Sequence, residues 1–124
     1  MGKYNVDMVL QRTPNTKKEG TMEFVVYKKG DSYVGVCLTF DIVEEGENPV
    51  DLMNSIKEAA ELHLDTVIKH NLDDSLLNRY APDEYWTVYF DALQKVSERS
   101  LNKSEEHLFL RVSPYNVGLV AQFA

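Results

Sequence analysis

Residues 48–70 carry the pattern that most limits what this chain can fold into, because they read as one long amphipathic helix. Asn48 is a favourable N-cap, Pro49 stands where a missing amide N–H costs nothing, and Asp51 complements the positive end of the helix. The apolar positions share one broad arc of such a helix: Leu52, Met53, Ile56, Ala59, Ala60, His63, Leu64 and Val67. This stripe must be buried, and a small sheet is the expected partner.

A β-hairpin and a third strand are expected just before the helix. Residues 22–29 alternate, with Phe24 and Val26 on one face and Val25 and Tyr27 on the other. The Gly30-Asp31 pair predicts a turn into a second strand over residues 32–40, where Gly35 indicates a bulge or a close contact. Residues 41–45 form the third strand, so the predicted order is β-β-β-α.

The two ends of the chain give weaker patterns. Residues 4–11 alternate well enough to predict a short strand, and residues 13–20 a polar loop. Residues 107–112 and 115–123 look like two further strands on either side of Ser113-Pro114, preceded by a solvated linker over 97–106.

A second helix is expected over residues 83–96, with a strand through 86–90 as the alternative reading. Pro82 and two acidic residues begin it, and its aromatic content is high for one small helix. Most of these rings are expected to pack on the sheet. The alternative is an interface with an oligomer or a partner, where Tyr and Trp are enriched, formed by Tyr85, Trp86, Tyr89 and Phe90.

Composition predicts one cytoplasmic domain of 124 residues, with a core over 22–70 and an extension over 79–124. No apolar run approaches the ~20 residues that span a bilayer. The net charge of −7, with scattered Lys and Arg, argues against direct binding of nucleic acid phosphates. The single Cys37 fits a reducing compartment.

No motif specifies an enzyme, a cofactor or a metal site. Asp41, Glu44 and Glu45 belong to the densest group of carboxylates, but an extended strand would place Glu44 on the face opposite the other two. His63 on an apolar arc is more often a packed residue than a ligand. Cys37 has no basic neighbour along the chain to activate it, and phosphate-binding and dinucleotide fingerprints are absent.

The run from residue 32 to 65 nevertheless resembles the core of the HicB family, the antitoxin partners in HicA–HicB toxin–antitoxin modules. The resemblance rests on the hairpin segment 33–37, on Glu45-Gly46 before the cap, and on the helix segment 56–65. It covers about residues 22–70, with an echo in 76–86. The chain departs from the family at Leu38-Thr39, where many members have proline and an acidic residue.

The resemblance implies a fold and a function. The fold would be α+β: a small antiparallel sheet with one long helix on one face, similar to a partial ribonuclease-H fold, plus a second helix and C-terminal strands. The function would be neutralisation of a small basic RNA-cleaving toxin, HicA-like, by protein–protein binding, without catalytic residues. No helix-turn-helix follows, so promoter binding is not implied. The expected contact residues are Tyr33, Asp41, Glu44 and Glu45.

Two other functions compete with this one. The first is a non-catalytic adaptor that forms a homo-oligomer through the aromatic segment and has no toxin partner. The second, ranked lowest, is a metal-dependent nuclease, because no strand supplies the spaced carboxylates that two-metal chemistry requires.

Overall fold

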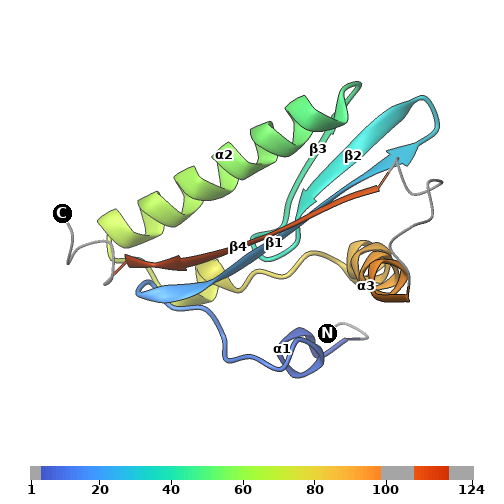
Figure 1. Cartoon of the computed structure of the whole chain (residues 1–124). Coiled ribbons are helices and arrows are strands. Elements are labelled where there is room, and N and C mark those ends of the chain that lie inside the picture. The colour runs from blue at the N-terminus through green and yellow to red at the C-terminus, as the bar shows by residue number, and fades with distance from the viewer. Residues whose placement is uncertain (1–3, 99–107, 118–124) are drawn as a thin grey trace.

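The computed structural model describes residues 4–98 and 108–117 and arranges them in three layers. A four-stranded sheet lies in the middle, the long helix α2 covers one face, and α1 and α3 lie on the other (Figure 1). The fold is therefore α+β, as predicted. The elements are α1 (Val6–Val9), β1 (Glu19–Lys29), β2 (Ser32–Cys37), β3 (Ile42–Gly46), α2 (Pro49–Lys69), η1 (Asp74–Leu77), α3 (Asp83–Glu98) and β4 (Leu108–Asn116).

The sheet has the strand order β3-β2-β1-β4, and every neighbouring pair is antiparallel. The predicted hairpin is confirmed: β1 and β2 pair in register from Phe24 with Cys37 to Lys29 with Ser32. Its bounds differ from the prediction, because β1 begins earlier, at Glu19, and residues 38–40 form a turn instead of continuing β2. Gly30 makes the turn at a φ of 64°, which glycine adopts without a steric penalty. The third strand is also confirmed, but it begins at Ile42, because Asp41 adopts a left-handed φ of 58° in the preceding turn.

The long helix begins and ends as the sequence predicts. The Asn48 side chain accepts hydrogen bonds from the backbone N–H groups of Val50 and Asp51, and Pro49 occupies the first turn. At 21 residues the helix is about 31 Å long. Its buried stripe packs on the Phe24 and Val26 side of the sheet and comprises Leu52, Ile56, Ala60, Leu64 and Val67.

Gly35 lets this helix approach the sheet closely. A Cβ atom built on Gly35 would lie 2.9 Å from Leu52 Cγ, closer than real Cβ contacts. The register of β2 with both neighbours runs through Gly35 without interruption. Of the two possibilities raised by the sequence, the close contact is confirmed and the bulge does not form.

The helix predicted over 83–96 is confirmed as α3, and the alternative strand through 86–90 is wrong. Its buried rings pack against the other face of the sheet, where Val25, Val34 and Val36 point. None of the described helices is long and apolar enough to cross a membrane.

The strand predicted over residues 4–11 is wrong, because this segment contains the helical turn α1. The Asn5 side chain caps it by accepting a hydrogen bond from the Met8 backbone N–H. Val6 is buried against the α3 side of the sheet, whereas Met8 and Val9 are exposed. The alternating pattern of this segment therefore corresponds to a capped helical turn, in which Val6 is the buried side chain.

At the other end, β4 joins the first predicted strand to the start of the second. β4 runs through Ser113 and Pro114 and pairs with β1 from Glu19 with Asn116 to Tyr27 with Leu108. Proline is tolerated within a strand at a sheet edge, and β4 is an edge strand, so Pro114 does not end it. Residues 97 and 98 of the predicted linker belong to α3. The rest of the linker (99–106), residue 107 of the first predicted strand and residues 118–123 of the second lie outside the described residues.

Candidate functional site

The four residues predicted to contact a partner do not form one patch. Tyr33 lies opposite Gly46, whereas Asp41 precedes Ile42 at the far end of β3, about 17 Å away along the hairpin. Tyr33 is also half-buried beside the α2-side core, with its ring 6.5 Å from that of Phe109. Tyr33 and Asp41 therefore mark opposite ends of the β2–β3 pair.

Glu44 and Glu45 lie together on the strand but point to opposite faces of the sheet. Glu44 pairs with Gly35 and faces α2, where its carboxylate accepts a hydrogen bond of 2.7 Å from the Ser55 hydroxyl. Glu45 pairs with Val34, whose side chain belongs to the α3-side core, and is exposed. The edge strand thus carries a carboxylate on each face.

The start of α2 adds further acidic groups beside Glu44 and Glu45. Glu47 and Asp51 are both exposed and line, with these two residues, a shallow hollow of about 440 Å³. The predicted acidic group therefore comes together here, except for Asp41, which lines a separate hollow with Tyr80 and Asp83. Among residues 4–98 and 108–117, no three His, Cys, Asp or Glu side chains are placed to hold a metal ion.

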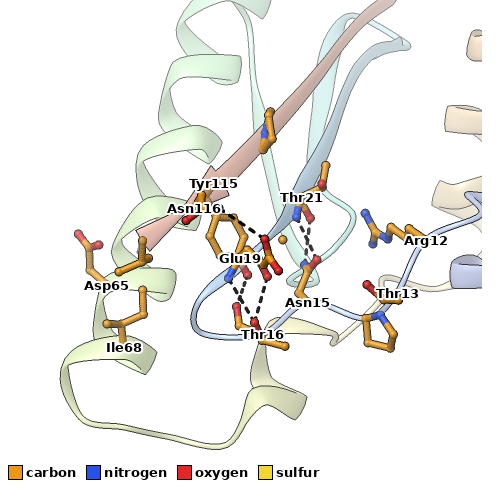
Figure 2. A pocket seen from close by; sticks show the side chains of 14 residues that line it. Arg12, Thr13, Asn15, Thr16, Glu19, Thr21, Asp65, Ile68, Tyr115 and Asn116 are labelled. Carbon is orange, nitrogen blue, oxygen red and sulfur yellow. Dashed lines mark hydrogen bonds between the residues drawn. The ribbon is translucent and has the colours of Figure 1, made fainter. Parts of the chain in front are cut away.

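A larger hollow, about 1090 Å³, lies between the 12–21 segment, the last turns of α2 and the end of β4 (Figure 2). Several of its polar side chains form hydrogen bonds with neighbouring backbone groups. The Asn15 amide bonds to the backbone of Thr21 and Leu77, and the Tyr115 hydroxyl donates to the Thr16 carbonyl over 2.7 Å. These hydrogen bonds hold the 12–21 segment against the sheet and the end of β4.

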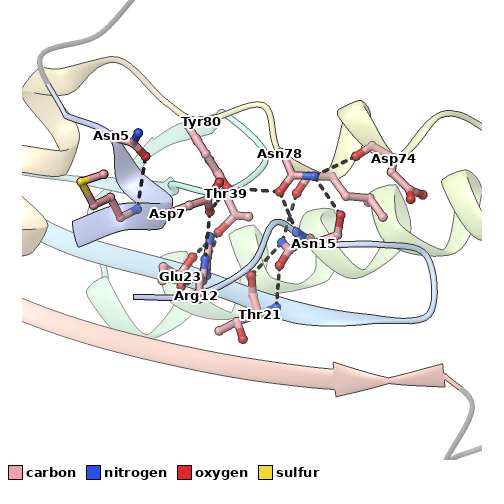
Figure 3. Close-up of polar contacts among 12 residues, drawn as sticks. Asn5, Asp7, Arg12, Asn15, Thr21, Glu23, Thr39, Asp74, Asn78 and Tyr80 are labelled. Atoms are coloured by element: carbon pink, nitrogen blue, oxygen red, sulfur yellow. Dashed lines mark hydrogen bonds and ion pairs between the residues drawn. The ribbon is translucent and has the colours of Figure 1, made fainter. Parts of the chain in front are cut away.

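A buried polar network, which the sequence reasoning missed, connects the N-terminal segment to the α3 side of the sheet (Figure 3). The Glu23 carboxylate is 3% exposed, forms an ion pair with Arg12 and accepts a hydrogen bond of 2.5 Å from the Thr39 hydroxyl. Tyr80 donates to Asp7 over 2.5 Å, and Arg12 also approaches Asp7. The sequence did contain a signal for this network. Glu23 is a charged residue that alternation places on the same face of β1 as the apolar Val25.

Burial governs the electrostatics of this network. Burial raises the pKa of Glu23, although the Thr39 hydroxyl and the Arg12 guanidinium both act in the opposite direction. Burial and the hydrogen bond to Asp7 raise the pKa of Tyr80 to about 12. Glu23 is buried and lines none of the three hollows described here. The network joins the N-terminal segment to β1 and to the residues that precede α3, which is a structural role.

Cys37 and His63 are placed as packing residues. Cys37 is fully buried on the α2 side, and burial raises the pKa of its thiol to about 12, which opposes nucleophilic chemistry. His63 is half-buried, with Nε2 2.7 Å from the Leu76 carbonyl and its ring 4.8 Å from that of Phe40. One nitrogen is therefore satisfied within the fold.

The aromatic segment is divided between the core and the surface. Trp86 is 0% and Tyr89 2% exposed, so these two rings have almost no surface left for a partner. Tyr85 and Phe90 are half-buried, and the Phe90 ring packs 5.4 Å from that of Trp86. Of the four rings predicted for an oligomer interface, Tyr85 and Phe90 are the two that keep exposed surface.

Comparison with known proteins assigns no family to the chain. No protein-family model matches it, and neither the curated proteins nor the solved structures give a match.

Proposed function

We propose that this chain is a HicB-like antitoxin that neutralises a small basic RNA-cleaving toxin by binding it. The observation that carries the proposal is the acidic end of the sheet, where exposed Glu45, Glu47 and Asp51 surround the hollow between β3 and the start of α2. The β-β-β-α core supports it, because this is the order that the HicB resemblance implies.

Charge explains how such a surface would act. A nuclease that binds RNA needs a basic face, and an acidic protein that covers this face blocks access of the RNA. Long-range attraction also raises the rate of encounter, and salt screens it. Exposed carboxylates keep most of their hydration until contact, so the expected effect is on the association rate and on partner choice.

The decisive experiment is co-expression and pull-down with the product of a neighbouring open reading frame that encodes a small basic protein. The expected result is a stable complex that suppresses RNA cleavage by this protein. If no basic protein is encoded beside this chain, or if the two proteins do not associate, the antitoxin proposal fails and the adaptor reading gains support.

The electrostatic part has its own test, the association rate measured against ionic strength. Replacing two exposed carboxylates, in the double variant Glu45→Lys and Glu47→Lys, should slow association at low salt about tenfold. The matched control is Asp91→Lys on the exposed side of α3, combined with Glu84→Lys, which changes net charge equally. Equal rates for the two double variants, or a wild-type rate indifferent to salt, would refute the assignment.

Self-association is a separate part of the proposal. We expect the antitoxin to form a homo-oligomer, with Tyr85 and Phe90 contributing the aromatic surface at the interface. Light scattering after size-exclusion chromatography measures the mass directly. If the protein is a monomer at micromolar concentration, the homo-oligomer part of the proposal fails, whereas the toxin-capture part is unaffected.

A further inference from the structure

The outer edge of β3 has no strand beside it among the described residues. The sheet order ends at β3, whose neighbour on the other side is β2. In an antiparallel edge strand, the backbone N–H and C=O groups of alternate residues point away from the sheet. These groups form a template to which another extended chain can add.

The side chains along this edge define what could pair with it. Glu44 projects on the α2 face and Glu45 on the α3 face, while Val43, on the same face as Glu45, is 42% exposed. An added strand would therefore meet a carboxylate on each face and one apolar side chain. Basic residues at two consecutive positions, followed by an aliphatic one, complement this order.

A second copy of this chain is a poor candidate for the same edge. Full antiparallel pairing of two β3 strands places Glu44 directly opposite Glu44 of the other copy. Like charges at directly opposed positions destabilise a strand pair. The edge of β3 therefore disfavours pairing with a second β3 strand and favours pairing with a strand that carries positive charge.

We propose that β3 captures its partner by strand addition: an extended segment of the partner, with consecutive Lys or Arg residues, pairs with Ile42–Gly46 and extends the sheet to five strands. The inference rests on the proposed function for the basic nature of the partner. It adds the mode of binding, in which backbone hydrogen bonds give affinity and the two carboxylates give selectivity.

The test uses three synthetic peptides of identical charge and side chains. The first, acetylated and amidated Thr-Val-Lys-Lys-Val-Thr, can donate hydrogen bonds along both of its edges. The other two carry N-methyl groups on alternate backbone nitrogens, one peptide for each edge, so that in one of them the methyl groups block the edge that faces β3. The full chain is titrated with each peptide, and amide shifts are followed by NMR.

We expect the unmethylated peptide to bind with shifts centred on residues 42–46, and one methylated pattern to bind about tenfold more weakly. The charge-reversed variant Glu45→Lys should weaken the unmethylated peptide, whereas Asp91→Lys should not. Equal binding of all three peptides, shifts centred elsewhere, or no binding at all would overturn strand addition.

Capture of the basic protein is scored separately. If the two proteins form a complex while the methylated and unmethylated peptides bind alike, the antitoxin proposal survives and strand addition fails. If the peptides discriminate but no basic protein is captured, strand addition survives and the antitoxin proposal fails.

Discussion

The two faces of the sheet come from the same alternating strands, yet they enclose different interiors. Under α2 the contacts are almost wholly apolar, centred on Phe24 and Ile56. Under α1 and α3 an apolar cluster around Trp86 adjoins the ion pair of Arg12 with Glu23. An apolar core tolerates apolar substitutions that conserve volume, whereas a buried charge requires its particular partner.

On the α3 side of the sheet, two buried hydrogen-bond donors lack an acceptor among the described residues. Arg12 Nη2 and Trp86 Nε1 have no hydrogen-bond partner among the described residues, and both lie on the α3 side. Leaving a buried donor unsatisfied costs about 1–3 kcal/mol. The polar face is therefore the part of the core where small changes should have large effects.

The largest expected effect is from Arg12→Ala, which leaves the buried Glu23 carboxylate without its ion-pair partner. Loss of one member of a buried pair typically costs about 3–5 kcal/mol of unfolding free energy. Urea denaturation of the variant measures this loss. In the double variant with Glu23→Gln the charge is gone, so part of the stability should return; an equally unstable double variant would mean that packing, not charge, explains the loss.

On the apolar face, the sharpest test is Gly35→Ala. The new Cβ would lie 2.9 Å from Leu52 Cγ and push α2 away from β2, at a cost of about 1–3 kcal/mol. Gly46→Ala is the matched control, because its Cβ would lie 3.6 Å from the nearest atom, an ordinary contact. Thermal unfolding should separate the two variants. Equal melting temperatures would show that the helix can shift without cost.

The smallest expected effect is from Tyr80→Phe, which removes the hydrogen bonds to Asp7 and Asn78 and should cost about 1 kcal/mol at neutral pH. The pKa of Tyr80, about 12 in the folded state, lies above the ordinary value of 10.0 for a tyrosine. The folded state therefore holds this proton more tightly, and the stabilisation is lost as pH rises from about 10 through about 12.

The variant Tyr80→Phe should accordingly show a shallower fall in stability over this alkaline range. Denaturation at a series of pH values measures the slope for the wild type and the variant. Because burial also raises the pKa of Tyr89 and Tyr115, part of the slope will remain. An unchanged slope would exclude a contribution from Tyr80.

The sequence alone determined the elements whose signals are local. The cap at Asn48, the apolar stripe of α2 and the Gly30-Asp31 turn each depend on neighbours a few residues away, so β1, β2, β3 and α2 were predictable. So was the acidic group at the start of α2, because Glu44, Glu45 and Glu47 are adjacent in the chain.

Only the tertiary structure decided the features that depend on distant segments. The continuity of β4 through Pro114 depends on its place at the sheet edge, and the burial of Glu23 depends on Arg12 arriving from the N-terminal segment. The division of the rings between the core and the surface depends on how α3 lies against the sheet. Alternation tells which residues share a face, but only the assembled layers decide what covers that face.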